Sequence, residues 1–276
     1  MIGPFLMTRL SLGAFYNPHL AEAILTNADQ IDHLALADAS RPSDQWWSQI
    51  SHRFTLLAHD YLGQLSEPLT IRQLDRARTL VDQYHSPWAA EHLQRIHPTP
   101  DHISGRPDVS LDYVFPPLYT EDLLQDYVQN IRVLQNYLGI PLAIEPIPTF
   151  LHIDFPQMSE TEFLHRLCEK SGCCLLLDIP HAMLSAYTYG RDPASFMLEF
   201  PLHRVIEIHV AGLAFNADLK RPWIAPVVPD KDMLDLAELA AAHAPQLRAI
   251  TFDAFSPSLR SDILFEGMQL LRERFV

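Results

Sequence analysis

The sequence has little cysteine, little glycine and few positive charges. Its three cysteines, Cys168 and the adjacent Cys173 and Cys174, match neither a disulfide framework nor a spaced zinc motif. We interpret them as buried thiols, because free cysteine packs as a small hydrophobic residue. Only 9 glycines occur, and no GxGxxG or GxxxxGK[ST] motif follows a candidate strand. The sequence therefore lacks the motifs that would indicate a nucleotide-binding fold.

The charge balance and the hydropathy pattern count against nucleic-acid-binding and membrane-spanning proteins. Lysine and arginine number 20 against 34 aspartates and glutamates, a formal net charge of −14, which opposes binding to a phosphate backbone. No apolar run reaches the roughly 18 residues of a membrane-spanning helix. The first residues, MIGPFLMTRL, lack the pattern of a signal peptide. We expect a cytoplasmic protein with no nucleic-acid partner and no membrane partner.

Short apolar runs alternate with longer amphipathic segments, as expected for parallel strands covered by helices. The apolar runs are 10–15, 31–36, 54–59, 87–93, 141–146, 173–179, 205–212 and 247–255. The helix-like stretches are 18–29, 43–52, 70–86, 120–139, 159–170, 191–200, 230–245 and 258–275. We predict an α/β fold, a xylose-isomerase-like (β/α)8 TIM barrel, as one domain over residues 1–276. The irregular stretch 93–118 is predicted to be a substrate-facing loop.

Six consecutive candidate strands end in side chains that can bind a metal ion. These are His59, Glu91 and His92, Glu145, Asp178 with His181 just beyond, His209, and Asp253. In a TIM barrel the carboxyl ends of all strands meet at one mouth, so these residues can lie close together. Imidazole mixed with carboxylate suits iron, manganese or zinc, and Glu145 or Asp178 can bridge two ions. Most of the other histidines, His33 among them, are interpreted as surface or packing residues.

With these residues in order, the chain resembles the multinuclear non-heme iron-dependent oxidases, a family that includes the methanobactin-biosynthesis oxidase and enzymes that modify cysteines in ribosomal peptides. The resemblance is strongest over residues 115–151 and 158–212, with further likeness at 56–70 and 89–93. It implies metal ligands at His59, His92, Glu145, Asp178 and His209. His181 stands where members usually have an asparagine, and imidazole can replace that amide as a ligand.

Several positions depart from the family pattern. Leu213 replaces a histidine, the segment 221–230 lacks the Asp-Thr-His motif, Pro146 replaces an asparagine, and Asp253 alone remains of a terminal Glu-x-Asp. The resemblance therefore implies a reduced centre of one or two iron ions rather than three, with Asp253 as a further ligand. The implied activity is oxidation by O2 of a cysteine-containing peptide or small protein, with a separate partner protein that delivers the peptide.

Two other functions stay open at this stage. Sugar isomerases or epimerases and endonuclease-IV-like hydrolases are similar barrels that hold divalent ions such as manganese or zinc, and they work without O2. The scarcity of basic residues counts against the nuclease. A non-catalytic metal-binding or scaffold protein is the third reading, because several ligand positions are altered.

Overall fold

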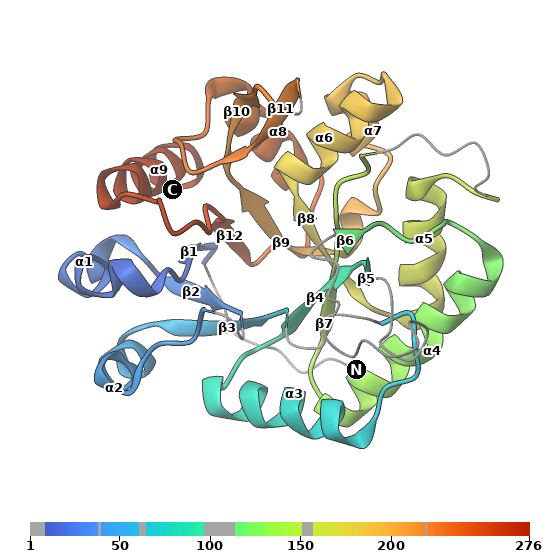
Figure 1. The fold of residues 1–276 in the computed structure, drawn as a ribbon, viewed down its shortest axis with the longest axis horizontal. Coiled ribbons are helices and arrows are strands. Elements are labelled where there is room, and N and C mark those ends of the chain that lie inside the picture. Colours follow the sequence, from blue (N-terminus) through green and yellow to red (C-terminus); the bar gives the residue numbers. More distant parts are fainter. Residues whose placement is uncertain (1–8, 38–39, 61–64, 97–113, 151–156, 219) are drawn as a thin grey trace.

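Parallel strands form a closed barrel at the centre of the protein (Figure 1). The computed structural model describes residues 9–37, 40–60, 65–96, 114–150, 157–218 and 220–276. Around the barrel the strands follow in the order β1 (Ser11–Phe15), β2 (His33–Leu36), β3 (Thr55–His59), β4 (Ala89–Leu93), β7 (Leu142–Pro146), β8 (Cys174–Asp178), β9 (Val205–Val210) and β12 (Ala249–Phe252). Strand β12 pairs with β1 and closes the ring. The predicted TIM barrel is confirmed.

Helices surround the strands in chain order, from α1 in blue to α9 in red (Figure 1). They are α1 (Ala21–Thr26), α2 (Asp44–Arg53), α3 (Ile71–Tyr84), α4 (Glu121–Leu138), α5 (Glu160–Ser171), α6 (Ile179–Tyr189), α7 (Pro193–Met197), α8 (Lys231–Ala242) and α9 (Ser261–Phe275). Several begin at a capping side chain: Thr70, Thr120 and Ser159 each accept a backbone N–H of the first turn. Within the described segments, no helix is both long and apolar enough to cross a membrane.

Residue alternation along the strands brings polar side chains into the barrel mouth. Leu57, Ala90, Ala143 and Leu176 belong to the buried apolar cluster inside the barrel. Side chains two positions apart on a strand share a face, so the residues that follow them by two also point into the barrel, one layer higher. Those residues are His59, His92, Glu145 and Asp178. The apolar layer is therefore the floor beneath a polar layer at the carboxyl ends of the strands.

Two expectations about the segments between strands are wrong. The helix expected at 191–200 is only the short α7, and the main helix after β8 is α6, which starts directly after Asp178. The side chain of Asp178 accepts the backbone N–H of His181 at 2.6 Å and so caps α6. The run 205–212 is not one strand either: β9 ends at Val210, and Gly212 opens a hairpin of β10 (Gly212–Asn216) and β11 (Arg221–Ala225).

The irregular stretch 93–118 is described only at its two ends. There β5 (Arg95–Ile96) pairs antiparallel with β6 (Val114–Phe115). Residues 97–113 lie outside the described part of the chain, so the substrate-facing role of this loop stays a prediction.

Candidate metal centre

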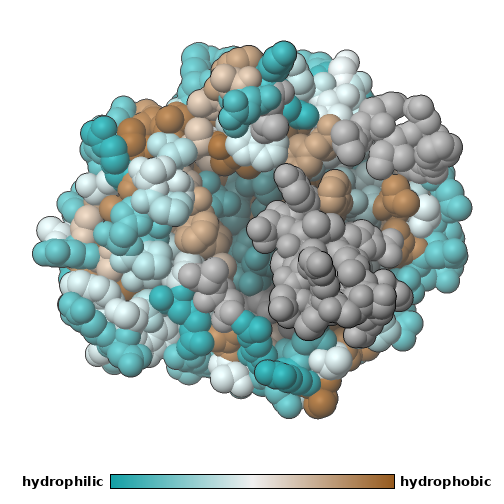
Figure 2. All heavy atoms as spheres, in the orientation of Figure 1, coloured by the Kyte–Doolittle hydropathy of each residue, from teal (hydrophilic) through white to brown (hydrophobic). Residues whose placement is uncertain are grey.

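The barrel brings all seven sequence-predicted ligands to one place. Six of them come from the ends of six different strands, and His181 comes from the first turn of α6. Neighbours around the ring are in register: His92 lies beside Glu145, and Asp178 lies beside His209. Figure 2 shows a hollow near the centre of one face, with hydrophilic residues inside it.

Glu145 lies at the centre of the cluster. Its Oε2 is 2.7 Å from Nε2 of His59 and 3.3 Å from Nε2 of His92. Its Oε1 is 3.3 Å from Nδ1 of His181 and 3.9 Å from Nδ1 of His209. The two oxygens of one buried carboxylate therefore face two different sets of imidazoles.

Two groups of ligand atoms are compact enough to hold an ion, with all atoms of a group within 4.8 Å of one another. The first group is His59, His92 and Glu145, and the second is Glu145, Asp178 and His209. Because Glu145 belongs to both groups, it has the position of a bridging carboxylate. Glu91, which the sequence pattern places beside His92, belongs to neither group.

His181 and Asp253 lie next to the second group without belonging to it. Nδ1 of His181 is 3.6 Å from Oδ1 of Asp178 and 3.0 Å from the carbonyl oxygen of Pro146. Oδ2 of Asp253 is 3.4 Å from Nδ1 of His209. Both are near enough to support the centre, and the ligand roles of all seven residues stay predictions.

The charges of the cluster are strongly coupled. Burial disfavours ionised Glu145, yet the imidazoles of His92 and His59 hold the pKa of this carboxyl well below its usual range. Burial and the charge of Glu145 raise the pKa of Asp178 well above its usual range. Burial also opposes a charged His92, but Glu145 and Asp60 raise its pKa to about 10. Protons thus balance the carboxylates, and a metal cation that binds here must displace them.

The donor set fits a cation because buried polar atoms of the cluster lack hydrogen-bond partners. They include Nδ1 of His59, Nδ1 of His209 and Oε1 of Glu145. A buried polar group left unsatisfied costs about 1–3 kcal/mol. An ion between these side chains would use Oε1 of Glu145 and Nδ1 of His209 as ligands. The mixture of imidazole and carboxylate suits iron, manganese or zinc.

Sequence reasoning missed Asp60, which follows His59 directly. Its Oδ1 is 3.3 Å from Nδ1 of His92, on the side of the ring away from Glu145. Asp60 has a φ of 53°, the left-handed region that residues other than glycine rarely adopt. Strained residues of this kind gather at functional sites. A carboxylate one position beyond a strand-end histidine was the available signal.

Glu207 was also missed, and it holds His209 from below. Its Oε1 is 3.2 Å from Nε2 of His209 and accepts the hydroxyl of Thr251 at 2.6 Å, while its Oε2 accepts the indole N–H of Trp88 at 2.7 Å. Since a carboxylate accepts, Nε2 of His209 carries the proton and Nδ1 is left for a metal. Such a carboxylate behind a ligand histidine fixes the tautomer and raises the basicity of the ring.

His33 continues this network across the floor of the barrel. Thr251 gives its proton to Glu207, so Nε2 of His33, 2.9 Å from the Thr251 hydroxyl, must donate to it. Nδ1 of His33 then accepts from the hydroxyl of Ser11 at 2.8 Å. A Cβ on Gly13 would lie 2.5 Å from the His33 ring, so only glycine leaves room for it. The histidine interpreted as a packing residue is buried inside the barrel.

Comparison with known proteins decides the family. The sequence model of the family described as "RiPP precursor modification enzyme MbnB/TglH/ChrH" matches residues 13–238. The chain belongs to this family. The resemblance stated from the sequence is confirmed, and the candidate ligands from His59 to His209 all lie within the matched part of the MbnB/TglH/ChrH family model.

This member of the MbnB/TglH/ChrH family is also similar to curated relatives in sequence and to solved structures in fold. A UPF0276 protein of Caulobacter vibrioides is 29% identical over 202 residues, which cover 73% of this chain and 69% of the relative. A UPF0276 protein of Haemophilus influenzae is 28% identical over 210 residues, which cover 72% and 66%. D-allulose 3-epimerase from Methylomonas sp. has a TM-score of 0.59 at 12% identity, covering 97% of this chain and 98% of its own. That likeness shows the fold alone.

Proposed function

We propose that this protein is an iron-dependent oxidase that uses O2 to oxidise a cysteine residue of a peptide or small protein. The observation that carries the proposal is the pair of ligand groups that share Glu145 at the mouth of the barrel. Membership of a family described as RiPP precursor modification enzymes supports a peptide substrate. As the family resemblance implies, we also propose a separate partner protein that delivers the peptide.

The residues that would hold the metal divide into two groups around Glu145. His59, His92 and Glu145 would hold one ion, and Glu145, Asp178 and His209 would hold a second. When bound, iron supplies the one-electron and O2 chemistry that side chains lack.

The chain itself orients the candidate ligands and leaves part of the candidate metal centre exposed. Glu207 fixes the His209 ring, and Phe15 packs edge-on against His59 with ring centroids 5.3 Å apart, which keeps water from that side. The Glu145 and His209 side chains are at most 1% exposed, whereas those of His92 and Asp253 are 20% and 23% exposed. We therefore expect a substrate thiol to approach between His92 and Asp253.

A second candidate is a metal-dependent sugar epimerase, because the similar barrels include a D-allulose 3-epimerase and a D-tagatose 3-epimerase-like protein. That reaction needs a divalent ion and no O2. A protein that binds metal without turnover is the third candidate.

Element analysis and O2 consumption separate the three candidates. Protein purified without O2 should contain iron, and it should consume O2 when a cysteine peptide is added but not with the matching serine peptide. His209→Ala should lose both iron and O2 consumption, whereas His243→Ala, which removes an exposed histidine of the α8 end, should keep both. Zinc or manganese alone with turnover of D-allulose would favour the epimerase. Folded protein without any metal would refute both enzymatic functions.

A further inference from the structure

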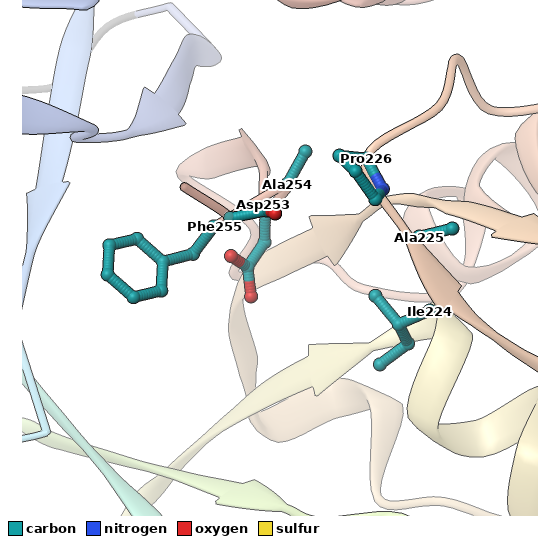
Figure 3. Close-up of a pocket in the computed structure, with 7 residues that line it drawn as sticks. Ile224, Ala225, Pro226, Asp253, Ala254 and Phe255 are labelled. Atoms are coloured by element: carbon teal, nitrogen blue, oxygen red, sulfur yellow. The ribbon is translucent and has the colours of Figure 1, made fainter. Parts of the chain in front are cut away.

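A pocket of about 310 Å³ opens beside the candidate metal centre (Figure 3). One wall is the end of β11 and the residue after it, positions 224–226. The other wall is the segment that follows β12, positions 253–256. In Figure 3 the Asp253 carboxylate lies between the Phe255 ring and Ile224. Ligand sites in proteins begin at roughly 300 Å³, so the pocket has room for one or two amino-acid side chains.

Asp253 joins this pocket to the metal centre. It lines the pocket, and its Oδ2 is 3.4 Å from Nδ1 of His209. The Phe255 ring contacts Phe15 at 5.4 Å between centroids, and Phe15 contacts the ring of the candidate ligand His59. An aromatic wall thus runs from the pocket to the first ligand group. A group bound in the pocket would lie next to an atom held at the metal.

Backbone contacts fix the walls in place. The N–H of Val227 donates to the carbonyl of Ala225 at 2.8 Å, which makes a tight turn around Pro226. Ala225 pairs with Gly212, where a Cβ would lie 2.2 Å from the carbonyl oxygen of Val227. Only glycine allows this approach. Across the pocket, the N–H of Asp253 donates to the carbonyl of Val210 at 2.9 Å. Because both walls are already set, binding requires little reorganisation.

The side chains of the pocket suit an apolar group. Apart from Asp253 and Ser256, the lining side chains are Ile224, Ala225, Pro226, Ala254 and Phe255. The hydroxyl of Ser256 already lies 2.9 Å from that of Ser258. A sugar in this pocket would leave most of its hydroxyls without side-chain partners, which is costly. An aliphatic or aromatic side chain would instead lose apolar surface to water.

We propose that this pocket binds an apolar side chain of the peptide substrate, from a residue next to the cysteine that is oxidised. The inference rests on the proposed function, and it adds a sequence requirement to the substrate. Ala254 and Ile224 are the specificity-determining residues, because their side chains face the space between the two walls in Figure 3.

Peptide binding tests the pocket directly. The probes are fluorescein-labelled hexapeptides Gly-Ser-Cys-Xaa-Ser-Gly and Gly-Xaa-Cys-Ser-Ser-Gly, with leucine, glycine or lysine at Xaa, and serine in place of cysteine as a control. Affinity is measured by fluorescence anisotropy without O2, on protein loaded with ferrous iron. In one of the two series the leucine peptide should bind about tenfold more tightly than the glycine peptide, the discrimination typical of an apolar pocket.

Filling the pocket should remove this preference. Ala254→Leu should reduce binding of the leucine peptide to the level of the glycine peptide, with iron content unchanged. Ile224→Phe tests the same space from the less buried wall if Ala254→Leu does not fold. Ala242→Leu, at an exposed position of α8, is the matched control and should keep the preference.

The possible failures are distinguishable. If cysteine peptides bind more tightly than serine peptides but leucine, glycine and lysine bind alike in both series, the pocket assignment is wrong and the proposed function stands. A preference for lysine, or a preference for leucine that survives both Ala254→Leu and Ile224→Phe, also overturns the pocket assignment. If cysteine and serine peptides bind equally, the thiol makes no contact with the iron and the proposed function fails, whatever the preference at Xaa.

Discussion

Replacing Glu207 by glutamine tests how the barrel floor supports the metal centre. In the native network Oε1 faces His209 and Thr251, and Oε2 faces the indole N–H of Trp88. Burial opposes ionisation, but the hydrogen bond and charge of His209 lower the pKa of Glu207 to about 2, so Glu207 is charged at neutral pH. Glu207→Gln removes this charge and turns an N–H group toward Trp88 or toward the other two donors.

The loss of stability and the loss of metal affinity are of similar size, but a second substitution should restore only the stability. If the new N–H group faces another N–H or O–H donor, one of the two donors has no acceptor, which costs about 1–3 kcal/mol of stability. Loss of the carboxylate behind a ligand histidine typically weakens metal binding about 10–100-fold, or roughly 1.4–2.7 kcal/mol. The double variant Trp88→Phe, Glu207→Gln removes the facing donor. It should regain part of the stability and none of the metal affinity.

A competition titration of ferrous iron against a chelator, without O2, measures the affinity, and urea unfolding measures the stability. For the iron affinity, Glu160→Gln is the matched control, because it replaces another buried carboxyl that contacts none of the predicted ligands. If the double variant binds iron as tightly as the native protein, Glu207 does not support the centre through His209, and this reasoning is refuted.

Three further predictions concern titrating groups. Burial raises the pKa of Glu160 to about 7. The stability that Glu160 contributes is therefore present below about pH 4.5 and is lost as the pH rises through 7. In urea unfolding, the free energy of unfolding of Glu160→Gln should rise by about 3 kcal/mol relative to that of the native protein across that window. Burial lowers the pKa of His33 to about 4, so the stability that His33 contributes is lost as the pH falls from about 6.5 to 4. Over the same fall in pH, the free energy of unfolding of His33→Gln should rise by about 3 kcal/mol relative to that of the native protein. Asp60→Asn should lower the pKa of His92 from about 10 in metal-free protein, seen by NMR titration of the imidazole. A difference in unfolding free energy between variant and native protein that does not change with pH would contradict the first two predictions. An unchanged pKa of His92 in Asp60→Asn would contradict the third.

The barrel and its mouth were predictable because two local signals coincide. Each barrel strand is an apolar run, and in six of the eight a polar side chain at or next to the strand end is visible in the same few letters, as in TLLAH before Asp60 and CLLLD before α6. The alternation of inward-facing residues then assigns His59 and Asp178 to one layer without any knowledge of distant contacts.

What the sequence did not reveal depends on contacts between distant segments. Trp88 and Glu207 are 119 positions apart, and nothing local to either residue indicates their hydrogen bond. The sequence analysis placed no helix between the run 173–179 and the stretch 191–200, where Asp178 caps α6 and Pro180 fits its first turn. The hairpin of β10 and β11 was missed because its strands pack beyond the barrel rather than within it.

The number of iron ions that depend on Glu145 tests the central claim most directly. Iron bound per chain should be measured after anaerobic loading of the native protein, Glu145→Gln and the His243→Ala control. The account predicts two ions per chain in the native protein and the control, one for each ligand group, and the loss of both in Glu145→Gln, because one carboxylate belongs to both groups. A folded native protein that binds no iron, or a Glu145→Gln variant that keeps its iron, would contradict the account.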